Sequence, residues 1–520
     1  MQGSQRGMIE ALSEPGAYPP PVDKVEYVET HISWVFLAGD YAYKFKKPLD
    51  LGFLDFTTRK RRLRFCREEL RLNGRLAPEI YLDVVGAQPT RDGWRVGELT
   101  ADAEPAVRMR RFPAEARLDR VLEAGRLDAE VLENFAGELA HFQRSLPPAR
   151  PGDGFGDAAT VTRPALENFQ ALPVEPLDGP GRQRLDELRQ WTQARAAVLA
   201  ERLTARLASG FIREGHGDLH LGNLVMLDGR VAAFDGIEFD PALRWIDLQS
   251  EVAFLLMDLE SRGHGALGWR FYNAWLAALG DYDGIGLLNW YLVYRHMVRA
   301  KIDGIRLSQG ELASSEATRL AARQAAHIEL ATRHARPPTP SLVVMHGLSG
   351  AGKSHLARRL APRLPAAWAR SDLERKRLHG LDPGSAASAA VGDGLYSAGA
   401  TERTYARLAE IARGALRSGV SMVVDAAFLE SRRREQFIDL ALECGGHPVV
   451  VACEAPAELL RKRVAARRND PSDADIAVLE SQLARPIEIG PREAPYRVAV
   501  DTSGEPDIDA LLNRLRSTRA

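Results

Sequence analysis

One short stretch restricts the fold of this chain more than any other. Residues 347–354 read Gly-Leu-Ser-Gly-Ala-Gly-Lys-Ser, which is the spacing G-x-x-x-x-G-K-S. The apolar run 342–345 leads into the stretch and an amphipathic segment starting at His355 follows it. In such a setting, between a strand and a helix, a glycine-rich turn wraps a phosphate with backbone N–H groups at a helix N-terminus. The sequence therefore predicts a nucleotide-binding loop in an α/β domain.

The residue types in this loop are those that binding of phosphate groups and Mg²⁺ requires. Glycines let the backbone come close to the phosphate oxygens, the amine of Lys353 reaches the outer phosphates, and the Ser354 hydroxyl is a ligand for Mg²⁺. We therefore expect ATP and Mg²⁺ as cofactors and assign Lys353 a catalytic role. The predicted nucleotide-binding residues are Gly347, Leu348, Ser349, Gly350, Ala351, Gly352, Lys353 and Ser354.

The chain is too long for one ordinary core, because 520 residues exceed the usual size of a single domain. The stiff sequence Arg-Pro-Pro-Thr-Pro at 336–340 is the clearest boundary. We expect residues 1–22 to be irregular and residues 23–335 to form a domain that opens with an α+β block and then turns helical. Beyond the spacer, residues 341–520 alternate between strand and helix patterns, which is typical of a parallel sheet with covering helices. Its strands are predicted at 342–346, 366–370, 420–425, 447–453 and 497–501.

Composition excludes several classes of protein. The hydrophobic fraction of 45% and the charged fraction of 27% are those of a soluble globular protein. A formal net charge of -1 creates no field that would draw the chain to nucleic acid or to an anionic membrane. No apolar run approaches the length of a membrane span, and no apolar segment typical of a signal peptide precedes the first prolines. The three cysteines show no ligand-like spacing. We expect a cytoplasmic protein without a membrane partner.

A second constellation lies in the larger domain. His216-Gly217-Asp218 is followed by Asn223, and the apolar run 231–234 ends at Asp235. The three polar residues thus lie on one loop and hairpin. Phosphoryl transfer needs such a set, because one carboxylate orients the attacking hydroxyl while an amide and a second carboxylate hold Mg²⁺.

This pattern resembles the aminoglycoside phosphotransferase-like kinases, relatives of the protein kinases, whose loop reads H-G-D-x-x-x-x-N with an aspartate after it. The resemblance implies a bilobal α+β fold, with an N-lobe at about 23–112 and a C-lobe at about 113–335. It also implies that Asp218 is the catalytic base and that Asn223 and Asp235 are metal ligands.

The resemblance extends upstream of the loop. Lys44 is similar to the strand lysine that holds the α- and β-phosphates, and Glu69 to its ion-pair partner, with Glu68 as the alternative. Lys46 shares a strand face with Lys44. Asp247 resembles an aspartate that braces the catalytic loop. Glu238, Asp240 and Asp258 are candidates for binding a cationic acceptor, although a structural role is favoured for them.

In the C-terminal domain, Val423-Val424-Asp425 has the form of a Walker B strand, which makes Asp425 a metal ligand. Ala426 stands where a mechanical ATPase carries a glutamate. The domain instead resembles small P-loop kinases of the polynucleotide, gluconate and zeta-toxin type. That resemblance implies that Asp372 is a catalytic base and that Arg375 binds substrate. It also implies that Arg463 and Arg467 belong to a lid over ATP.

The sequence therefore predicts an ATP- and Mg²⁺-dependent phosphotransferase with two nucleotide sites. The acceptors would be hydroxyl-bearing small molecules or, at the C-terminal site only, a polynucleotide end. One alternative makes one domain a nucleotide-sensing regulator of the other with little turnover. Another is a nucleic-acid-associated ATPase, which the near-zero net charge disfavours.

Overall fold

The computed structural model describes residues 2–52, 54–91, 93–175, 177–309, 312–382, 397–466 and 476–517. Contacts between residues divide the chain into two compact units. The first comprises Met1–Val131, Leu146–Thr160 and Thr204–Glu251, and the second comprises Leu132–Ser145, Val161–Leu203 and Val252–Ala520. The second unit therefore joins helices that precede the 336–340 spacer to the sheet that follows it. The domain boundaries expected from the sequence stay predictions.

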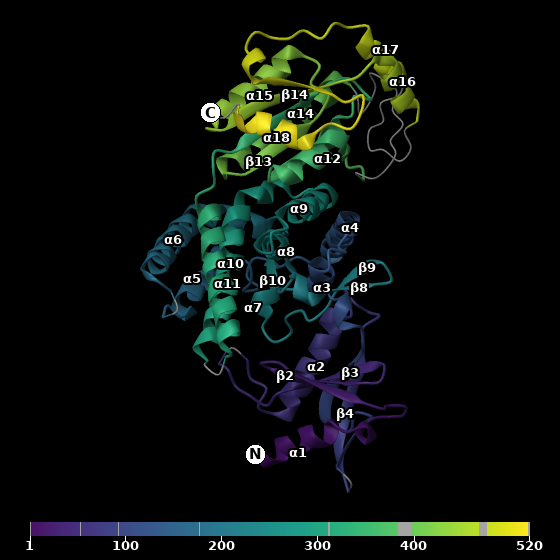
Figure 1. The fold of residues 1–520 in the computed structure, drawn as a ribbon, viewed down its shortest axis with the longest axis vertical. Helices are drawn as coiled ribbons and strands as arrows, with labels where there is room; N and C mark the ends of the chain where they lie inside the picture. The colour runs from purple at the N-terminus through teal and green to yellow at the C-terminus, as the bar shows by residue number, and fades with distance from the viewer. Residues whose placement is uncertain are drawn as a thin grey trace. The chain divides into compact units, whose positions relative to one another are not determined.

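The first unit is built on a six-stranded antiparallel sheet in the order β1-β2-β3-β6-β4-β5. A tight turn at Gly39 joins β2 to β3, and the long basic helix α2 lies against β4 and β6 (Figure 1). The elements are β1 (Val25–Glu29), β2 (Ser33–Ala38), β3 (Tyr41–Lys46), α2 (Arg59–Asn73), β4 (Tyr81–Thr90), β5 (Gly93–Gly97) and β6 (Glu104–Arg110).

The N-terminal segment departs from the prediction. Residues 1–22 were expected to be irregular, but helix α1 occupies Gln2–Leu12 and a short 3-10 turn occupies Pro15–Ala17. Met8 and Leu12, one helical turn apart, are buried in the cluster that contains Trp34 and Phe36. Glycines and serine give α1 a poor intrinsic helix propensity, so the burial of these two side chains against the sheet stabilises it.

Two short antiparallel strand pairs also belong to the first unit. β7 (Ile212–Glu214) pairs with β10 (Trp245–Asp247), and β8 (Leu224–Leu227) pairs with β9 (Arg230–Ala233). The chain between β7 and β8 forms the loop 215–223, which ends in the 3-10 turn η3 (Leu221–Asn223). The loop and the end of β9 carry the predicted kinase motif. Three short elements flank them: η2 (Ala114–Ala116), α3 (Leu118–Glu123) and α7 (Pro241–Arg244).

The second unit begins with long helices that bury an aromatic and aliphatic core. α10 and α11 lie side by side along their length (Figure 1). Residues of α4, α5, α6 and α8 belong to this unit in large part, and no helix among the described residues is long and apolar enough to cross a membrane. The helices are α4 (Ala129–Ser145), α5 (Ala158–Ala171), α6 (Gly179–Ala208), α8 (Leu248–Ser261), α9 (Gly265–Leu279), η4 (Tyr282–Gly284), α10 (Ile285–Ser308) and α11 (Ser314–Ala335).

A five-stranded parallel sheet in the order β12-β13-β11-β14-β15 follows, and all five predicted strands are confirmed. They are β11 (Ser341–His346), β12 (Ala366–Arg370), β13 (Ser421–Asp425), β14 (His447–Glu454) and β15 (Arg497–Asp501). The accompanying helices are α12 (Lys353–Arg363), α13 (Ser371–Leu378), α14 (Ala398–Arg417), α15 (Ser431–Glu443), α16 (Ala457–Ala465), α17 (Ile476–Leu483) and α18 (Ile508–Ser517), with the 3-10 turn η6 (Ala494–Tyr496).

The edge strand β12 is covered by the helical part of the same unit. The buried amide of Asn273 on α9 donates to Ala366 O at 3.0 Å and accepts from Trp368 N–H at 2.9 Å. Tyr282 Oη donates to Trp368 O at 3.0 Å. These side chains occupy the hydrogen-bonding positions that an additional strand would take, and so block the exposed edge of the sheet.

Candidate active sites

The N-terminal site starts from two lysines on β3. Lys44 and Lys46 are two residues apart, so their side chains leave the same face of the strand. Lys44 Nζ donates to Glu69 Oε1 of α2 at 2.8 Å and also to Asp235 Oδ1. Glu68, the alternative partner, instead forms ion pairs with Arg71 and Arg244, so the lysine of the motif pairs with Glu69.

Lys46 extends this pair into a buried chain of charges. Its Nζ donates to both Glu69 Oε2 and Glu238 Oε1, and the Lys46 side chain is fully buried. Burial opposes ionisation of Glu69, but Lys44 and Lys46 hold its pKa down at about 2. Burial likewise opposes the charge of Lys44, yet Asp235 and Glu69 raise its pKa well above the usual value. Glu238 is therefore a buried partner of Lys46, which agrees with the structural role favoured for it.

The catalytic-loop residues come together at η3 and the end of β9. Asn223 Nδ2 donates to Asp218 Oδ2 at 2.9 Å and to Asp218 O at 3.0 Å. Asp235 has a left-handed backbone with a φ of 61°, and its N–H donates to Tyr81 Oη at 3.0 Å. Tyr81 thus fixes the turn that directs the Asp235 carboxylate to Lys44.

Two further side chains, those of His216 and Glu251, hold the loop in place. Asp218 N–H donates to His216 Nδ1 at 3.3 Å, so the proton of this buried imidazole lies on Nε2, which donates to Phe234 O at 2.9 Å. Burial lowers the pKa of His216 and keeps the ring neutral. Glu251 accepts from the N–H groups of His216 and Gly217. Asp247 forms a bidentate pair with Arg206 at 2.5 and 2.7 Å, and its expected role in bracing the loop stays a prediction.

The C-terminal site is a cavity of about 600 Å³ at the carboxyl ends of β11 and β13. Its wall contains part of the glycine-rich loop together with the predicted polar residues of α13, β13 and α16. The predicted residues that line it are Ser349, Gly350, Gly352, Lys353, Ser354, Asp372, Arg375, Asp425 and Arg463. Residues more than 100 positions apart in the sequence thus face one space.

Close packing explains the glycines of the loop. A Cβ atom at Gly347 would lie 2.6 Å from Cys453 O, and one at Gly350 would lie 2.9 Å from Leu460 O. Both glycines have positive φ angles, of 144° and 81°, which side-chain-bearing residues rarely adopt. Lys353, the first residue of α12, donates from Nζ to the O atoms of Gly347 and Leu348 at 2.9 Å each. Arg463 donates to Thr502 O at 2.7 Å and to Gly350 O at 3.4 Å, which ties α16 to the loop.

Two carboxylates face this cavity. Asp425 ends β13 and is buried, and its Oδ2 has no hydrogen-bond partner among the residues that the structure describes. Burial and the neighbouring Asp425 carboxylate raise the pKa of Asp372 at the start of α13. Arg375, one turn further along α13, donates to Thr401 Oγ1 at 3.2 Å.

Two separate family models match the parts of the chain that carry the two candidate sites. The phosphotransferase enzyme family matches residues 55–288, and an AAA domain matches residues 342–487. The uncharacterized protein Rv2004c of Mycobacterium tuberculosis (strain ATCC 25618 / H37Rv) is 31% identical over 483 residues, which are 90% of this chain and 93% of the relative. The chain belongs to the same family as this mycobacterial protein. It is a fusion of an aminoglycoside phosphotransferase-like kinase domain with a P-loop kinase-like domain, and it is a phosphotransferase.

Solved structures resemble each half separately. The amicoumacin kinase hAmiN is 14% identical with a TM-score of 0.38, covering 63% of this chain and 93% of that protein. A gluconokinase from Sinorhizobium meliloti 1021 is 19% identical with a TM-score of 0.25, covering 35% of this chain and 91% of that protein.

The donor atoms of both sites in this phosphotransferase fit Mg²⁺, which prefers oxygen ligands. In the N-terminal site Asn223 uses its Nδ2 to bind Asp218, which leaves its amide oxygen for a cation. The carboxylate of Asp235 would supply a further oxygen ligand. In the C-terminal site Ser354 lines the same cavity as Asp425, whose Oδ2 has no partner in the described part of the chain. A buried carboxylate oxygen without a partner is costly, and a bound cation would satisfy it.

Several residues that the sequence reasoning missed also contribute. Gln482 accepts from Ser349 N–H at 2.8 Å, and Thr502 donates to Ala351 O at 2.9 Å, so residues far downstream support the loop. Tyr405 and Glu430 line the cavity. None of these carries a local motif, so only a sequence alignment or the fold itself indicates them.

The three arginines at 432–434 differ from one another. Arg432 is exposed, whereas Arg433 lines the cavity and lies over the Tyr405 ring. Arg434 is fully buried and pairs with Glu493 at 2.6 Å, which gives it a structural role. Arg467, the second predicted lid arginine, lies outside the described residues.

Proposed function

We propose that this phosphotransferase has two separate sites, each of which transfers the γ-phosphoryl group of Mg·ATP to a hydroxyl group of an acceptor. One observation carries the proposal most directly. A single cavity contains the P-loop lysine, two carboxylates and a further arginine, which are Lys353, Asp372, Asp425 and Arg375. These are the groups that phosphoryl transfer needs for phosphate binding, proton acceptance, metal binding and charge neutralisation.

In the N-terminal site, Lys44 would hold the α- and β-phosphates of ATP while Glu69 keeps its amine in position. Asn223 and Asp235 would hold Mg²⁺. Asp218 would accept the proton of the acceptor hydroxyl, since its carboxylate is about one-third exposed and its orientation is set by Asn223. The ion supplies the charge that offsets the negative charge of the transferred phosphoryl group.

In the C-terminal site, residues 347–354 would wrap the phosphates and Ser354 and Asp425 would hold Mg²⁺. Asp372 would act as the base, because its raised pKa strengthens it as a proton acceptor relative to an ordinary aspartate. Arg375 would bind the acceptor. The acceptors are hydroxyl-bearing small molecules and, at this site only, a polynucleotide 5′-hydroxyl end is an alternative.

The proposal predicts two activities that can be removed one at a time. With full-length protein and a panel of alcohols, sugars, nucleosides and 5′-hydroxyl oligonucleotides, Asp218→Asn should remove one acceptor-dependent ATP consumption. Asp372→Asn should remove a different one. Each loss should be at least about 100-fold, the lower range for removal of a general base. ADP formation and labelled product measured for each acceptor provide the readout.

Two exposed aspartates provide matched controls. Asp228→Asn changes the turn between β8 and β9, and Asp509→Asn changes the first turn of α18, so neither should alter turnover. If Asp218→Asn or Asp372→Asn leaves every acceptor-dependent rate intact, the site it tests does not work as proposed.

A second candidate function is regulation of the P-loop site by the helical part of the protein. The observation that favours it is the contact between α9 and β12, because Asp372 follows β12 directly and Asn273 binds the backbone of that strand on both sides of Ala367. A change in α9 would therefore change the position of α13.

Asn273→Ala tests this coupling. Loss of two buried hydrogen bonds should reduce kcat/KM at the C-terminal site by about tenfold, since each bond contributes on the order of 1 kcal/mol. Asn289→Ala is the control, because it removes a similar amide contact, to Ser418 O at 2.9 Å, that lies away from Asp372. Equal rates in the two variants would reject coupling through β12.

A further inference from the structure

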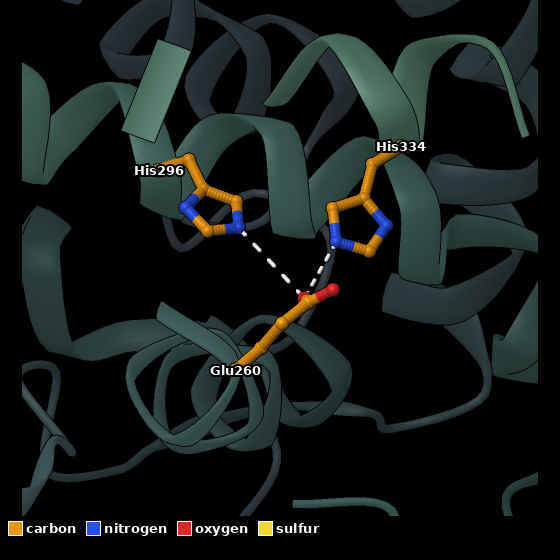
Figure 2. Close-up of side chains that lie close together, drawn as sticks. All are labelled: Glu260, His296 and His334. Atoms are coloured by element: carbon orange, nitrogen blue, oxygen red, sulfur yellow. Dashed lines mark hydrogen bonds and ion pairs between the residues drawn. The ribbon is translucent and has the colours of Figure 1, made fainter. Parts of the chain in front are cut away.

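Three ionisable side chains that belong to neither active site converge between helices of the second unit. Glu260 lies near the end of α8, His296 in the middle of α10 and His334 in the last turn of α11. Figure 2 shows the two imidazole rings and the carboxylate pointing toward one another. His334 Nε2 is 2.7 Å and His296 Nε2 is 3.9 Å from Glu260 Oε2.

The donor set and its spacing suit a transition-metal ion. Two imidazole nitrogens and one carboxylate oxygen are typical ligands of Zn²⁺. The three ligand atoms lie within 4.8 Å of one another. Ligands of a tetrahedral ion with bonds of about 2.0–2.2 Å are about 3.3–3.6 Å apart. The two distances to Glu260 Oε2 lie on either side of this range, so small side-chain rotations would bring the atoms into place.

The burial of His296 is an independent indication. The residue is fully buried, and its Nε2 has no hydrogen-bond partner among the described residues although it faces Glu260 and His334 (Figure 2). A buried imidazole nitrogen without a partner is costly, and coordination of a cation is one way to satisfy it.

A neighbouring histidine can set the tautomer that coordination needs. His327 on α11 is buried, and its Nδ1 lies 3.1 Å from His296 Nδ1. One of the two rings must donate in this hydrogen bond. When His296 donates from Nδ1, its Nε2 carries a lone pair directed at Glu260 and His334. Hydrogen bonding of the second ring nitrogen is the usual way in which proteins orient a metal-binding histidine.

We propose that Glu260, His296 and His334 bind one divalent transition-metal ion, with Zn²⁺ as the preferred occupant, and that His327 orients His296. The ion would tie the last turn of α11, which leads into the spacer at 336–340, to α8 and α10. With three protein ligands, a water molecule would complete a tetrahedral shell. By joining residues of α8, α10 and α11, the ion would act structurally.

The test uses the full-length protein after removal of metal with a chelator. Titration with Co²⁺ should produce visible absorption that saturates at one ion per chain. Zn²⁺ should displace the bound Co²⁺ and raise the melting temperature of the protein. Glu260→Gln and His334→Gln should each weaken Zn²⁺ binding by more than about 100-fold, the upper figure for losing only an outer-shell partner. His327→Gln should weaken it by about 10–100-fold.

His264→Gln is the matched control, because this exposed histidine lies in the turn after α8. It should bind the metal like the unmodified protein. Circular dichroism of the metal-free variants shows whether each one folds, and the four glutamine substitutions preserve side-chain polarity for that purpose. Failure of the metal-free protein to take up Co²⁺, or equal binding by His334→Gln, Glu260→Gln and the control, would overturn the proposal.

Discussion

The two candidate active sites keep their charged groups in place in different ways. In the N-terminal site a chain of ion pairs runs from Asp235 through Lys44, Glu69 and Lys46 to Glu238, so each lysine lies between two carboxylates. In the C-terminal site Lys353 binds backbone carbonyl groups of its own loop, and one oxygen of Asp425 has no partner among the described residues.

The difference illustrates two routes to a pre-organised site. Side chains that neutralise one another make the first site dependent on a network in which every member matters. Backbone geometry makes the second site dependent on glycines, because no other residue fits the turn. We therefore expect the first site to be most sensitive to removal of a charge and the second to addition of a methyl group.

The largest expected effect is on the charge network. Lys46→Met leaves buried Glu238 without its cation and Glu69 with only one. It should lower the free energy of unfolding by about 3–5 kcal/mol, the usual cost of breaking a buried ion pair from one side. Chemical denaturation measures the change. Lys60→Met on the exposed face of α2 is the control and should stay within about 0.5 kcal/mol. A loss below about 1 kcal/mol for Lys46→Met would mean that the network contributes little.

The next effect concerns the glycine-rich loop. Gly347→Ala would place a Cβ atom 2.6 Å from Cys453 O, and a backbone atom cannot move aside as a side chain can. We expect the affinity of the C-terminal site for Mg·ATP to fall by at least about tenfold, because strain of 1–3 kcal/mol is typical of such backbone positions. Calorimetric titration should show one of two binding events weakened.

Gly414→Ala is the matched control for this substitution. Gly414 lies within α14, and an added Cβ atom meets nothing within 4 Å. The variant should bind as before and be slightly more stable, since alanine favours a helix over glycine. Unchanged binding by Gly347→Ala would show that the loop can relax.

The smallest expected effect concerns pH dependence. The pKa of Glu69 in the N-terminal site is lowered, whereas the pKa of Asp372 in the C-terminal site is raised. The pKa of Glu69 is held at about 2 by its lysines, so it stays ionised throughout the range of an assay. The pKa of Asp372 is raised, and a base must lose its proton to act. Activity of the C-terminal site should therefore fall as the pH decreases, with an apparent pKa in kcat/KM above that of an ordinary aspartate. An acid limb at the ordinary aspartate value would contradict this assignment.

The sign of the corresponding stability effects is opposite at the two sites. Because the folded-state pKa of Glu69 is lowered, its stabilising contribution is present above the unfolded pKa of about 4.3 and is lost as the pH falls toward about 2. Because the pKa of Asp372 is raised, the folded state binds its proton more tightly than the unfolded chain does. Its contribution therefore decreases as the pH rises from the ordinary aspartate value through the raised one.

Much of the fold follows from local patterns in the sequence. The strands at 342–346 and 366–370 are bounded by clear breaks, and the loop at 347–354 carries its function in consecutive residues, so both could be predicted without knowledge of the fold. Helix α1 could not, because its stability comes from burying Met8 and Leu12 against distant strands. The role of Glu251 in holding the catalytic loop was equally hidden, since it depends on how the chain after β10 packs on residues 216–217.

Local patterns in the sequence were enough to predict the order of the two motifs, the loops that carry them and the chemical type of each predicted site residue. These properties depend on residues that are close in the chain. Tertiary structure decided the partner of Lys44, the position of Lys46 between Glu69 and Glu238, and the meeting of Glu260, His296 and His334. Residue spacing fixes which face of a helix or strand a side chain occupies, but only packing brings that face toward a particular neighbour.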